Sequence, residues 1–417
     1  MATQIPADIH TFDFWARPWA ERNETFSLLR DQAPVRWSPP AESVLMPPDE
    51  NTAGFWSVFR HEDIVKVSRN AKVFSSAEGV FMEDFPKEVR DASLSFIVQD
   101  APRHTQLRGI VVKAFSARNM AKLEAEATTV AAELMDEVGP LGEGDFGKLY
   151  ARQLPGRLFA NFFGVPAGDL RDEAMHCAEM MASWSDPDEL GGLAPIEAFG
   201  GAAMRLNEIA HQLTAERRDA PGDDLLSWVI QAEFDGERLT DAEIGSFFSL
   251  LAAAANDTTR HSLSHGLLAL RQNPDQRALL MEDLEGRLDS TVDEILRYAT
   301  PLLHMRRTAT EDTVVAGQEI AAGDKVVLWY CSGNRDGSVF DEPDEFRILR
   351  TPNRHLGFGG GGPHFCLGSN LAKATLRAAL LQIHTRIPDI SVGEPEFLVA
   401  NFVHGIKSLP ATWTPTA

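Results

Sequence analysis

Cysteine is scarce in this sequence. The 417 residues contain three cysteines, Cys177, Cys331 and Cys366, and no CxxC pair. Such an odd, sparse set argues against a disulfide framework and a zinc site, and favours a reducing compartment. The longest apolar run, around residues 247–255, is too short for a membrane span, and residues 1–6 lack the features of a signal peptide. We therefore expect a cytoplasmic protein without a membrane anchor.

Excess positive charge, flexible linkers and repeats are also missing. The formal net charge is −22, which argues against a nucleic-acid partner because such partners require a basic surface. No Ser- or Gly-rich linker, repeat or low-complexity tract divides the chain, and 44% of its residues are hydrophobic, enough for a large core. These features predict a single domain over residues 1–417.

Helical periodicity predominates in the chain. It covers most of residues 61–300, whereas short β-type runs occur near residues 34–60 and 305–325. Residues 43–46 are predicted to be one of these strands. The sequence therefore predicts a mainly α protein with small β-sheets.

One predicted helix is unusually long. Thr240 and Glu243 form a capping box at its start, and no helix breaker follows until Pro274, so the helix should cross the molecule. An alanine run in its middle leaves room for a planar group. Asp257 and Thr258 then place an acid and a hydroxyl in an apolar stretch. The threonine could bond to the preceding turn in a structural role, but a buried aspartate without a partner is costly, which favours a functional role.

A glycine-rich loop near the C-terminus contains the third cysteine. Five of the six residues 357–362 are glycine, and Cys366 follows, just before a helical run at residues 371–384. Glycines let the backbone approach a flat or crowded group, and the start of a helix favours a thiolate. With His364 two residues earlier, Cys366 is suited to axial ligation of a haem iron.

Two other interpretations of this loop remain open at this point. Gly357, Gly359 and Gly362 match the dinucleotide fingerprint GxGxxG, but the preceding strand and the later acidic residue that this motif requires are missing. Alternatively, the loop is structural and Cys366 is an ordinary buried cysteine.

The irregular segment 75–99 carries large apolar side chains: Phe81, Met82, Phe85 and Phe96. Long irregular segments of this kind are often binding loops. A surface loop packed onto the core is an equally good interpretation.

The next segment is predicted to be a helix capped by Asp100, with Pro102 in its first turn. His104 and Arg108 are four residues apart, so they share one side of this helix and can converge on one anion. The alternative is a polar surface in contact with solvent.

Five motifs occur in the order and at the spacing of one known family. They are residues 104–108 (HTQLR), 254–259 (AANDTT), 294–297 (EILR), 307–309 (RTA) and 362–368 (GPHFCLG). On these motifs the sequence resembles the cytochrome P450 family of haem-thiolate monooxygenases over nearly its whole length. The resemblance implies the family's fold, with the long helix crossing the haem and the haem loop and its helix at residues 355–386.

The resemblance also implies haem b (iron protoporphyrin IX) as cofactor. Cys366 would be the thiolate ligand of the iron, within a loop that includes Phe358, Gly360 and Gly368. Four side chains would hold the haem propionates: His104, Arg108, Arg307 and His364.

Further roles follow from the same resemblance. Asp257 and Thr258 resemble the acid–alcohol pair that delivers protons to bound dioxygen, and Ala255 would line the oxygen groove. Glu294 and Arg297 resemble a buried structural pair that a further arginine joins.

Three positions depart from the family's common pattern. The haem loop has one additional glycine between Phe358 and Cys366, which makes the placement of Phe358 less secure. Ala255 stands where glycine is usual. An acid occupies the usual position of the third arginine in residues 343–346, which leaves Arg347 or Arg350 to join the buried pair.

The implied reaction inserts one atom of O₂ into a C–H bond of a hydrophobic small molecule. Two electrons would come from a separate ferredoxin or flavodoxin with its reductase, docking on a locally basic surface around Cys366. We expect a monomer. The sequence is most similar to a bacterial branch that acts on steroids, terpenoids and methyl-branched lipids. Candidate pocket residues are Phe81, Met82, Phe85, Phe96, Phe247, Leu251, Ala254, Leu303 and Phe402.

Two other functions remain as alternatives. The first is a tailoring oxidase for a macrocyclic or carrier-bound secondary metabolite, which would need a wider and more polar pocket. The second is a haem-based ligand sensor or carrier without turnover, for which the Asp257–Thr258 pair would have no use.

Overall fold

The structure is a computed structural model that describes residues 8–182, 184, 190 and 192–416. Helices make up most of it. In chain order they are α1 (Phe12–Trp15), α2 (Trp19–Gln32), α3 (His61–Arg69), α4 (Lys87–Leu94), α5 (Arg103–Ala114), α6 (Ala117–Val138), α7 (Gln153–Phe162), α8 (Asp169–Ala182), α9 (Pro195–Asp219), α10 (Leu225–Gln231), α11 (Asp241–Gln272), α12 (Pro274–Glu282), α13 (Leu284–Ala299), α14 (Tyr330–Gly333) and α15 (Ser369–Arg386).

The strands are short and form small sheets. They are β1 (Val35–Ser38), β2 (Phe55–Val58), β3 (Phe74–Ser75), β4 (Glu143–Asp145), β5 (His304–Ala309), β6 (Thr313–Val315), β7 (Gln318–Ile320), β8 (Lys325–Trp329), β9 (Ser391–Val392), β10 (Glu396–Phe397), β11 (Ile406–Ser408) and β12 (Pro410–Thr412). The largest sheet has the order β1-β2-β8-β5-β3, in which β2 and β8 are parallel and the other pairs antiparallel. It therefore joins strands that are far apart in the sequence.

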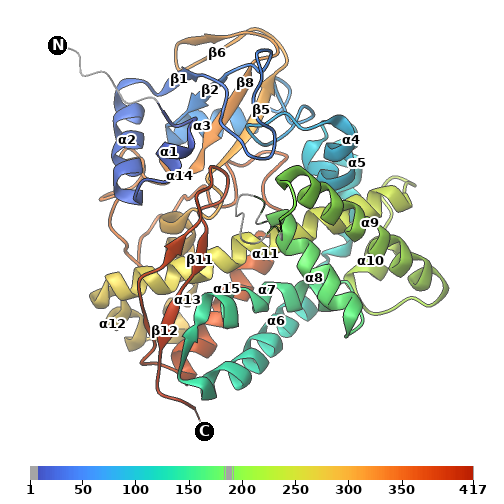
Figure 1. Cartoon of the computed structure of the whole chain (residues 1–417), viewed down its shortest axis with the longest axis vertical. Helices are drawn as coiled ribbons and strands as arrows, with labels where there is room; N and C mark the ends of the chain where they lie inside the picture. The colour runs from blue at the N-terminus through green and yellow to red at the C-terminus, as the bar shows by residue number, and fades with distance from the viewer. Residues whose placement is uncertain (1–7, 183, 185–189, 191, 417) are drawn as a thin grey trace.

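Helix α11 runs through the middle of the molecule, with the five-stranded sheet and α6 on opposite sides of it (Figure 1). The Thr240 hydroxyl accepts a hydrogen bond from the Glu243 amide (3.3 Å), and the Glu243 carboxylate accepts one from the Thr240 amide (2.9 Å). The predicted capping box and helix are thus confirmed. Pro274 also begins α12, a role that suits proline at a first helical position.

Two local predictions are wrong. Residues 43–46 form a bend, and the outer strand is β1, because the Ser43 hydroxyl accepts hydrogen bonds from the Leu45 and Met46 amides and occupies the donors that a strand would use. Asp100 does not cap α5, which begins at Arg103. The Asp100 carboxylate instead accepts a hydrogen bond from the Ser76 amide (3.0 Å).

A buried ion cluster connects α13 to the segment before the glycine-rich loop. Glu294 and Arg297 are fully buried and form two hydrogen bonds of 2.7 and 2.8 Å. The Arg350 guanidinium joins them, with Nε 3.2 Å from both carboxylate oxygens of Glu294. Arg347 contributes only its backbone amide to Glu294, because its side chain pairs with Glu345 and Asp341. Of the two candidates for the third arginine, the structure places Arg350 in that position.

Among the described residues, the helices are all too short or too polar to cross a membrane.

Candidate functional site

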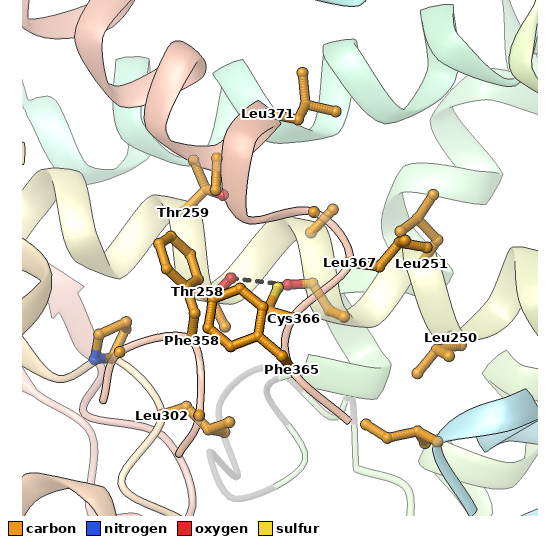
Figure 2. A pocket seen from close by; sticks show the side chains of 18 of the residues that line it. Leu250, Leu251, Thr258, Thr259, Leu302, Phe358, Phe365, Cys366, Leu367 and Leu371 are labelled. Atoms are coloured by element: carbon orange, nitrogen blue, oxygen red, sulfur yellow. Dashed lines mark hydrogen bonds between the residues drawn. The ribbon is translucent and has the colours of Figure 1, made fainter. Parts of the chain in front are cut away.

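A cavity lies between the middle of α11 and the glycine-rich loop that leads into α15 (Figure 2). It contains about 1680 Å³ of space, part of which opens to solvent. Most of the side chains around it are apolar. They include Phe96, Ile97, Phe159, Phe247, Leu250, Leu251, Leu302, Met305 and Leu371.

The loop places Phe358 beside Cys366 despite its additional glycine. The Cys366 amide donates to the Phe358 carbonyl (3.1 Å), and the Gly359 amide donates to the Leu356 carbonyl (2.8 Å). Both side chains line the cavity (Figure 2).

Two of the glycines are required by close packing against α3. Gly362 has φ +79°, and a Cβ there would lie 2.5 Å from the Ser68 carbonyl oxygen. A Cβ at Gly360 would lie 2.7 Å from the Ser68 hydroxyl. Gly360 is buried against α3 and is therefore not placed at the cavity, contrary to its predicted role in cofactor binding. Gly357 and Gly359 line the cavity instead, together with Gly368.

Cys366 is open to the cavity but lies deep among protein atoms. Burial raises the pKa of its thiol, while the Gly368 amide and the Arg108 guanidinium act in the opposite direction. The sequence predicted that the start of α15 would favour a thiolate. Within the protein alone, desolvation outweighs that effect, so a thiolate here requires a bound cation such as a metal ion.

The four predicted propionate ligands converge at one edge of the cavity. The rings of His104 and His364 are 4.3 Å apart, and Arg108, Arg307 and His364 line the cavity. Burial, followed by the Arg307 guanidinium, His104 and Arg108, lowers the pKa of His364 to about 2. Burial and the Arg108 charge lower the pKa of His104 to about 4, and its buried Nε2 lacks a hydrogen-bond partner among the described residues.

Asp257 and Thr258 point in different directions from α11. Thr258 lines the cavity, as do Ala254 and Ala255, and its hydroxyl donates to the Ala254 carbonyl (2.8 Å, dashed in Figure 2). Thr258 therefore makes the predicted hydrogen bond to the preceding turn of the helix, and its side chain also faces the cavity. Asp257 lies outside the cavity wall and is buried, and burial raises the pKa of its carboxyl to about 6.

The predicted pocket residues divide into two groups. Phe96, Phe247, Leu251 and Ala254 line the cavity. Five others pack away from it: Phe81, Met82, Phe85, Leu303 and Phe402.

These five form two packed groups. The centroid of the Phe81 ring lies 4.3 Å from that of Phe402 and 5.2 Å from that of Phe85, so these three rings pack against one another. Met82 and Leu303 belong to the core cluster around Trp329.

Two cavity residues that the sequence analysis missed had a detectable signal. Leu302 faces the cavity while its neighbour Leu303 faces the core, as expected for extended chain, in which successive side chains point to opposite sides. Leu250 lies four residues before Ala254 on the same side of α11, a spacing that was visible in the sequence. Phe159 and Leu371 come from other helices, and nothing in their local sequence indicated the cavity.

The cavity is chemically suited to an iron porphyrin. Cys366 offers one sulfur ligand, and Ala254 and Ala255 leave a low surface on the opposite wall. The cationic edge, in which the guanidinium groups of Arg108 and Arg307 lie beside the neutral imidazoles of His104 and His364, can pair with two carboxylates. The unpartnered Nε2 of His104 is one of the atoms that such carboxylates would satisfy.

Comparison with known proteins agrees with this geometry. Residues 197–384 match the family model described as Cytochrome P450. The methyl-branched lipid omega-hydroxylase of Mycobacterium tuberculosis strain H37Rv is 38% identical over 99% of this chain and 96% of that protein. The steroid C26-monooxygenase of Rhodococcus jostii is 37% identical over 93% of this chain and 82% of that protein.

A solved structure is similar over the same length. A cytochrome P450 of Mycobacterium marinum in complex with pseudoionone is 44% identical, with 99% of each chain covered and a TM-score of 0.93. The chain thus shares the fold of these proteins over nearly its whole length, and its cysteine loop faces a cavity beneath the central helix. It belongs to the cytochrome P450 family, whose members are monooxygenases that bind haem b through a cysteine thiolate.

Proposed function

We propose that the chain hydroxylates an aliphatic carbon of a methyl-branched lipid, or of a steroid or terpenoid with a branched chain. One observation carries this proposal: the cavity wall around Cys366 and Thr258 is made mainly of apolar side chains, with Leu250, Leu251 and Leu302 among them (Figure 2). An apolar wall selects a hydrocarbon portion of the substrate. Two relatives are named for branched-lipid and steroid substrates, which supports the same class.

The same wall speaks against a macrocyclic or carrier-bound substrate. Such a molecule would bring several polar groups to the cavity, and each would lose its hydrogen bonds to water on entry. The hydroxyl of Thr258 donates to the Ala254 carbonyl, and the Ser262 hydroxyl donates to the Thr258 carbonyl (2.6 Å), so neither proton is free to bond a polar group of such a substrate.

In the proposed mechanism each predicted side chain has one task. Haem, when bound, supplies the activation of O₂ that places one oxygen atom in a substrate C–H bond. Cys366 would hold its iron, and the cationic edge would hold its propionates. Thr258 would orient a proton at its hydroxyl, and Asp257 would provide that proton from behind the helix. The apolar wall would exclude water and hold the substrate carbon in place.

We also propose that a separate ferredoxin or flavodoxin, with its reductase, supplies the two electrons. Support comes from the surface near the loop, where exposed Arg69 lies close to Gly361 and half-exposed Lys373 lies 5.8 Å from the Phe358 ring. The cytoplasmic location, the monomeric state and the single-domain organisation stay predictions.

The proposal is tested by visible spectroscopy of the haem-loaded protein. We expect methyl-branched fatty acids, or steroids and terpenoids with branched chains, to shift the ferric iron from low to high spin with saturation. Linear fatty acids of equal carbon number are the matched control, and tighter binding of those would contradict the branched-chain assignment. Cys366→Ser should abolish the thiolate-type carbon monoxide spectrum, and survival of that spectrum would remove Cys366 from its role.

A further inference from the structure

A histidine that has no part in the cavity faces the aspartate behind α11. Asp257 and His261 are four residues apart on this helix and both are buried. His261 Nε2 lies 3.8 Å from Asp257 Oδ1. Asp257 Oδ2 and His261 Nε2 have no hydrogen-bond partner among the described residues. A buried imidazole nitrogen and a buried carboxylate oxygen that both lack partners, on side chains that approach to 3.8 Å through Oδ1, indicate a hydrogen bond that forms with a small movement.

The backbone of the C-terminal segment fixes the proton on this imidazole. The Ile406 amide of β11 donates a hydrogen bond to His261 Nδ1 (3.1 Å), so Nδ1 carries a lone pair. Burial, helped by the nearby Arg260 and His265, lowers the pKa of His261 well below its usual value, and the ring is neutral. A neutral imidazole carries one proton, which must then be on Nε2, the atom facing Asp257.

Other charged groups near Asp257 come from α11 itself, from α8 and from the segment that precedes α7. Arg260, on the same helix, has NH1 3.9 Å from Asp257 Oδ1, and its NH2 donates to the Ile406 carbonyl (3.4 Å). Glu179 of α8 raises the pKa of Asp257, and Arg152, which precedes α7, lowers it. Arg152 and Glu179 are hydrogen-bonded to each other (Nε to Oε1, 2.5 Å), so their opposite effects largely cancel. Arg260 is the charged group that favours the ionised carboxyl most and lowers its pKa, and His261 adds an uncharged, directional N–H donor.

We propose that His261 is a positioning residue for Asp257: its Nε2–H holds the carboxylate on the side of α11 away from the cavity and sets the proton affinity of that carboxyl group. The proposal rests on the proposed proton-delivery role of Asp257. His261 does not pass protons onward, because its other nitrogen is occupied by the Ile406 amide. Protons therefore reach Asp257 by another route, and His261 determines where the carboxylate waits and how readily it accepts a proton.

Two substitutions separate this role from simple packing. In His261→Asn the side-chain oxygen can still accept from the Ile406 amide, but no donor reaches Asp257. In His261→Gln the longer amide places an N–H near the former Nε2 position and gives up the ideal contact with Ile406. A purely structural histidine would tolerate Asn better than Gln, whereas a positioning donor would be replaced better by Gln.

The measurement is infrared spectroscopy of the ferric, haem-loaded protein over a pH series, with the carboxylic acid band of Asp257 identified by its loss in Asp257→Asn. We expect the apparent pKa of Asp257 to rise by about one unit in His261→Asn, because a donor to a charged group is lost, and to stay near the wild-type value in His261→Gln. His384→Asn, a buried histidine on α15, is the matched control and should leave the band unchanged.

An Asp257 band that titrates identically in the wild type, His261→Asn and His261→Gln would overturn the inference, as would a larger shift in Gln than in Asn. The pH profile of product formed per electron consumed should move with the band. Failure of the proposed function shows differently, as loss of the spin shift or of the thiolate-type spectrum in the wild type. The infrared band does not depend on either result.

Discussion

Burial of Asp257 makes the stability of the protein depend on pH, and the sign of the effect can be tested. Burial raises the pKa of this carboxyl from 3.8 to about 6, so the folded state binds its proton more tightly than the unfolded state does. The stabilising contribution is complete below pH ~4 and is lost as pH rises through about 6. Above that pH, ionised Asp257 lowers the free energy of unfolding by roughly 3 kcal/mol, at 1.36 kcal/mol per pKa unit.

Asp257→Asn should therefore raise the free energy of unfolding by about 3 kcal/mol at pH 7.5 and by little at pH 4. Urea unfolding at both values measures the difference. A gain of equal size at the two pH values would mean that the substitution acts through packing and that ionisation is not the cause.

The Glu294 carboxylate is the centre of the buried ion cluster on α13. It accepts hydrogen bonds from Arg297, Arg350 and Asn353, the last at 3.1 Å from Nδ2. Glu294→Gln leaves two arginine charges without their buried counter-ion, so we expect the free energy of unfolding to fall by roughly 3–5 kcal/mol.

Arg347→Gln is the matched control for this cluster. The Arg347 side chain is 38% exposed and pairs with exposed carboxylates, so its loss should change stability by less than ~1 kcal/mol. Equal losses from Glu294→Gln and Arg347→Gln in urea unfolding would contradict the assignment of Arg350 as the joining arginine.

At the scale of elements, the Asp84 carboxylate is one of several polar groups that hold the segment from Ser76 to Val98, together with the hydrogen bonds from Arg306 to the Val80 and Glu83 carbonyls. Asp84 forms an ion pair with Arg306 of β5 (2.6 Å) and another with Lys325 of β8. Both cations are buried, whereas Asp84 is half exposed. The segment carries Phe96 on the cavity wall, so its position affects the shape of that wall.

Asp84→Asn should loosen this segment, because two buried cations lose their counter-ion. We expect amide hydrogen exchange in residues 76–98 to accelerate about tenfold while α15 is unchanged. Asp223→Asn, which removes an exposed partner of Lys122, is the control and should have no effect there. Unchanged exchange in the segment would show that its other hydrogen bonds and apolar contacts hold it without the Asp84 ion pairs.

The sequence predicted elements with a clear periodic pattern of apolar residues well, and it predicted contacts between elements poorly. The capping box at Thr240 and the apolar pattern beyond it predicted α11 closely, because both are local signals. Cys366 and Phe358 were placed together at the cavity by the family resemblance. Gly360 was misassigned because its contact is with Ser68, which is almost three hundred residues away in the chain.

The pocket shows the same limit. All large apolar side chains of residues 81–85 were equally good candidates by composition, but ring packing against Phe402 and Phe199 removes Phe81 and Phe85 from the cavity wall. Likewise, Asp257 and Thr258 are adjacent in the sequence, but consecutive residues of a helix point about 100° apart, so only Thr258 lines the cavity. The contact between His261 and Ile406 joins α11 to a strand near the C-terminus, and no local pattern predicts it.

At the scale of the whole molecule, the charge distribution bears on electron supply. The net charge is −22, yet the surface around the loop that carries Cys366 includes the cations Arg69, Arg108 and Lys373. A small acidic electron-transfer protein would be repelled by the net charge of the molecule and attracted locally by these cations, which would direct its encounter.

Arg69→Glu reverses one exposed charge on this surface without touching the cavity wall. We expect the second-order rate of reduction by an acidic ferredoxin to fall about tenfold at low ionic strength, and the difference to shrink as salt screens the charges. Stopped-flow reduction under carbon monoxide measures this rate.

Lys87→Glu on α4, an exposed cation on the segment over the cavity, is the matched control and should leave the rate nearly unchanged. If Lys87→Glu slows reduction as much as Arg69→Glu does, net charge governs the encounter and the loop surface is not the docking site; if neither variant nor salt changes the rate, the electron donor is not an acidic protein.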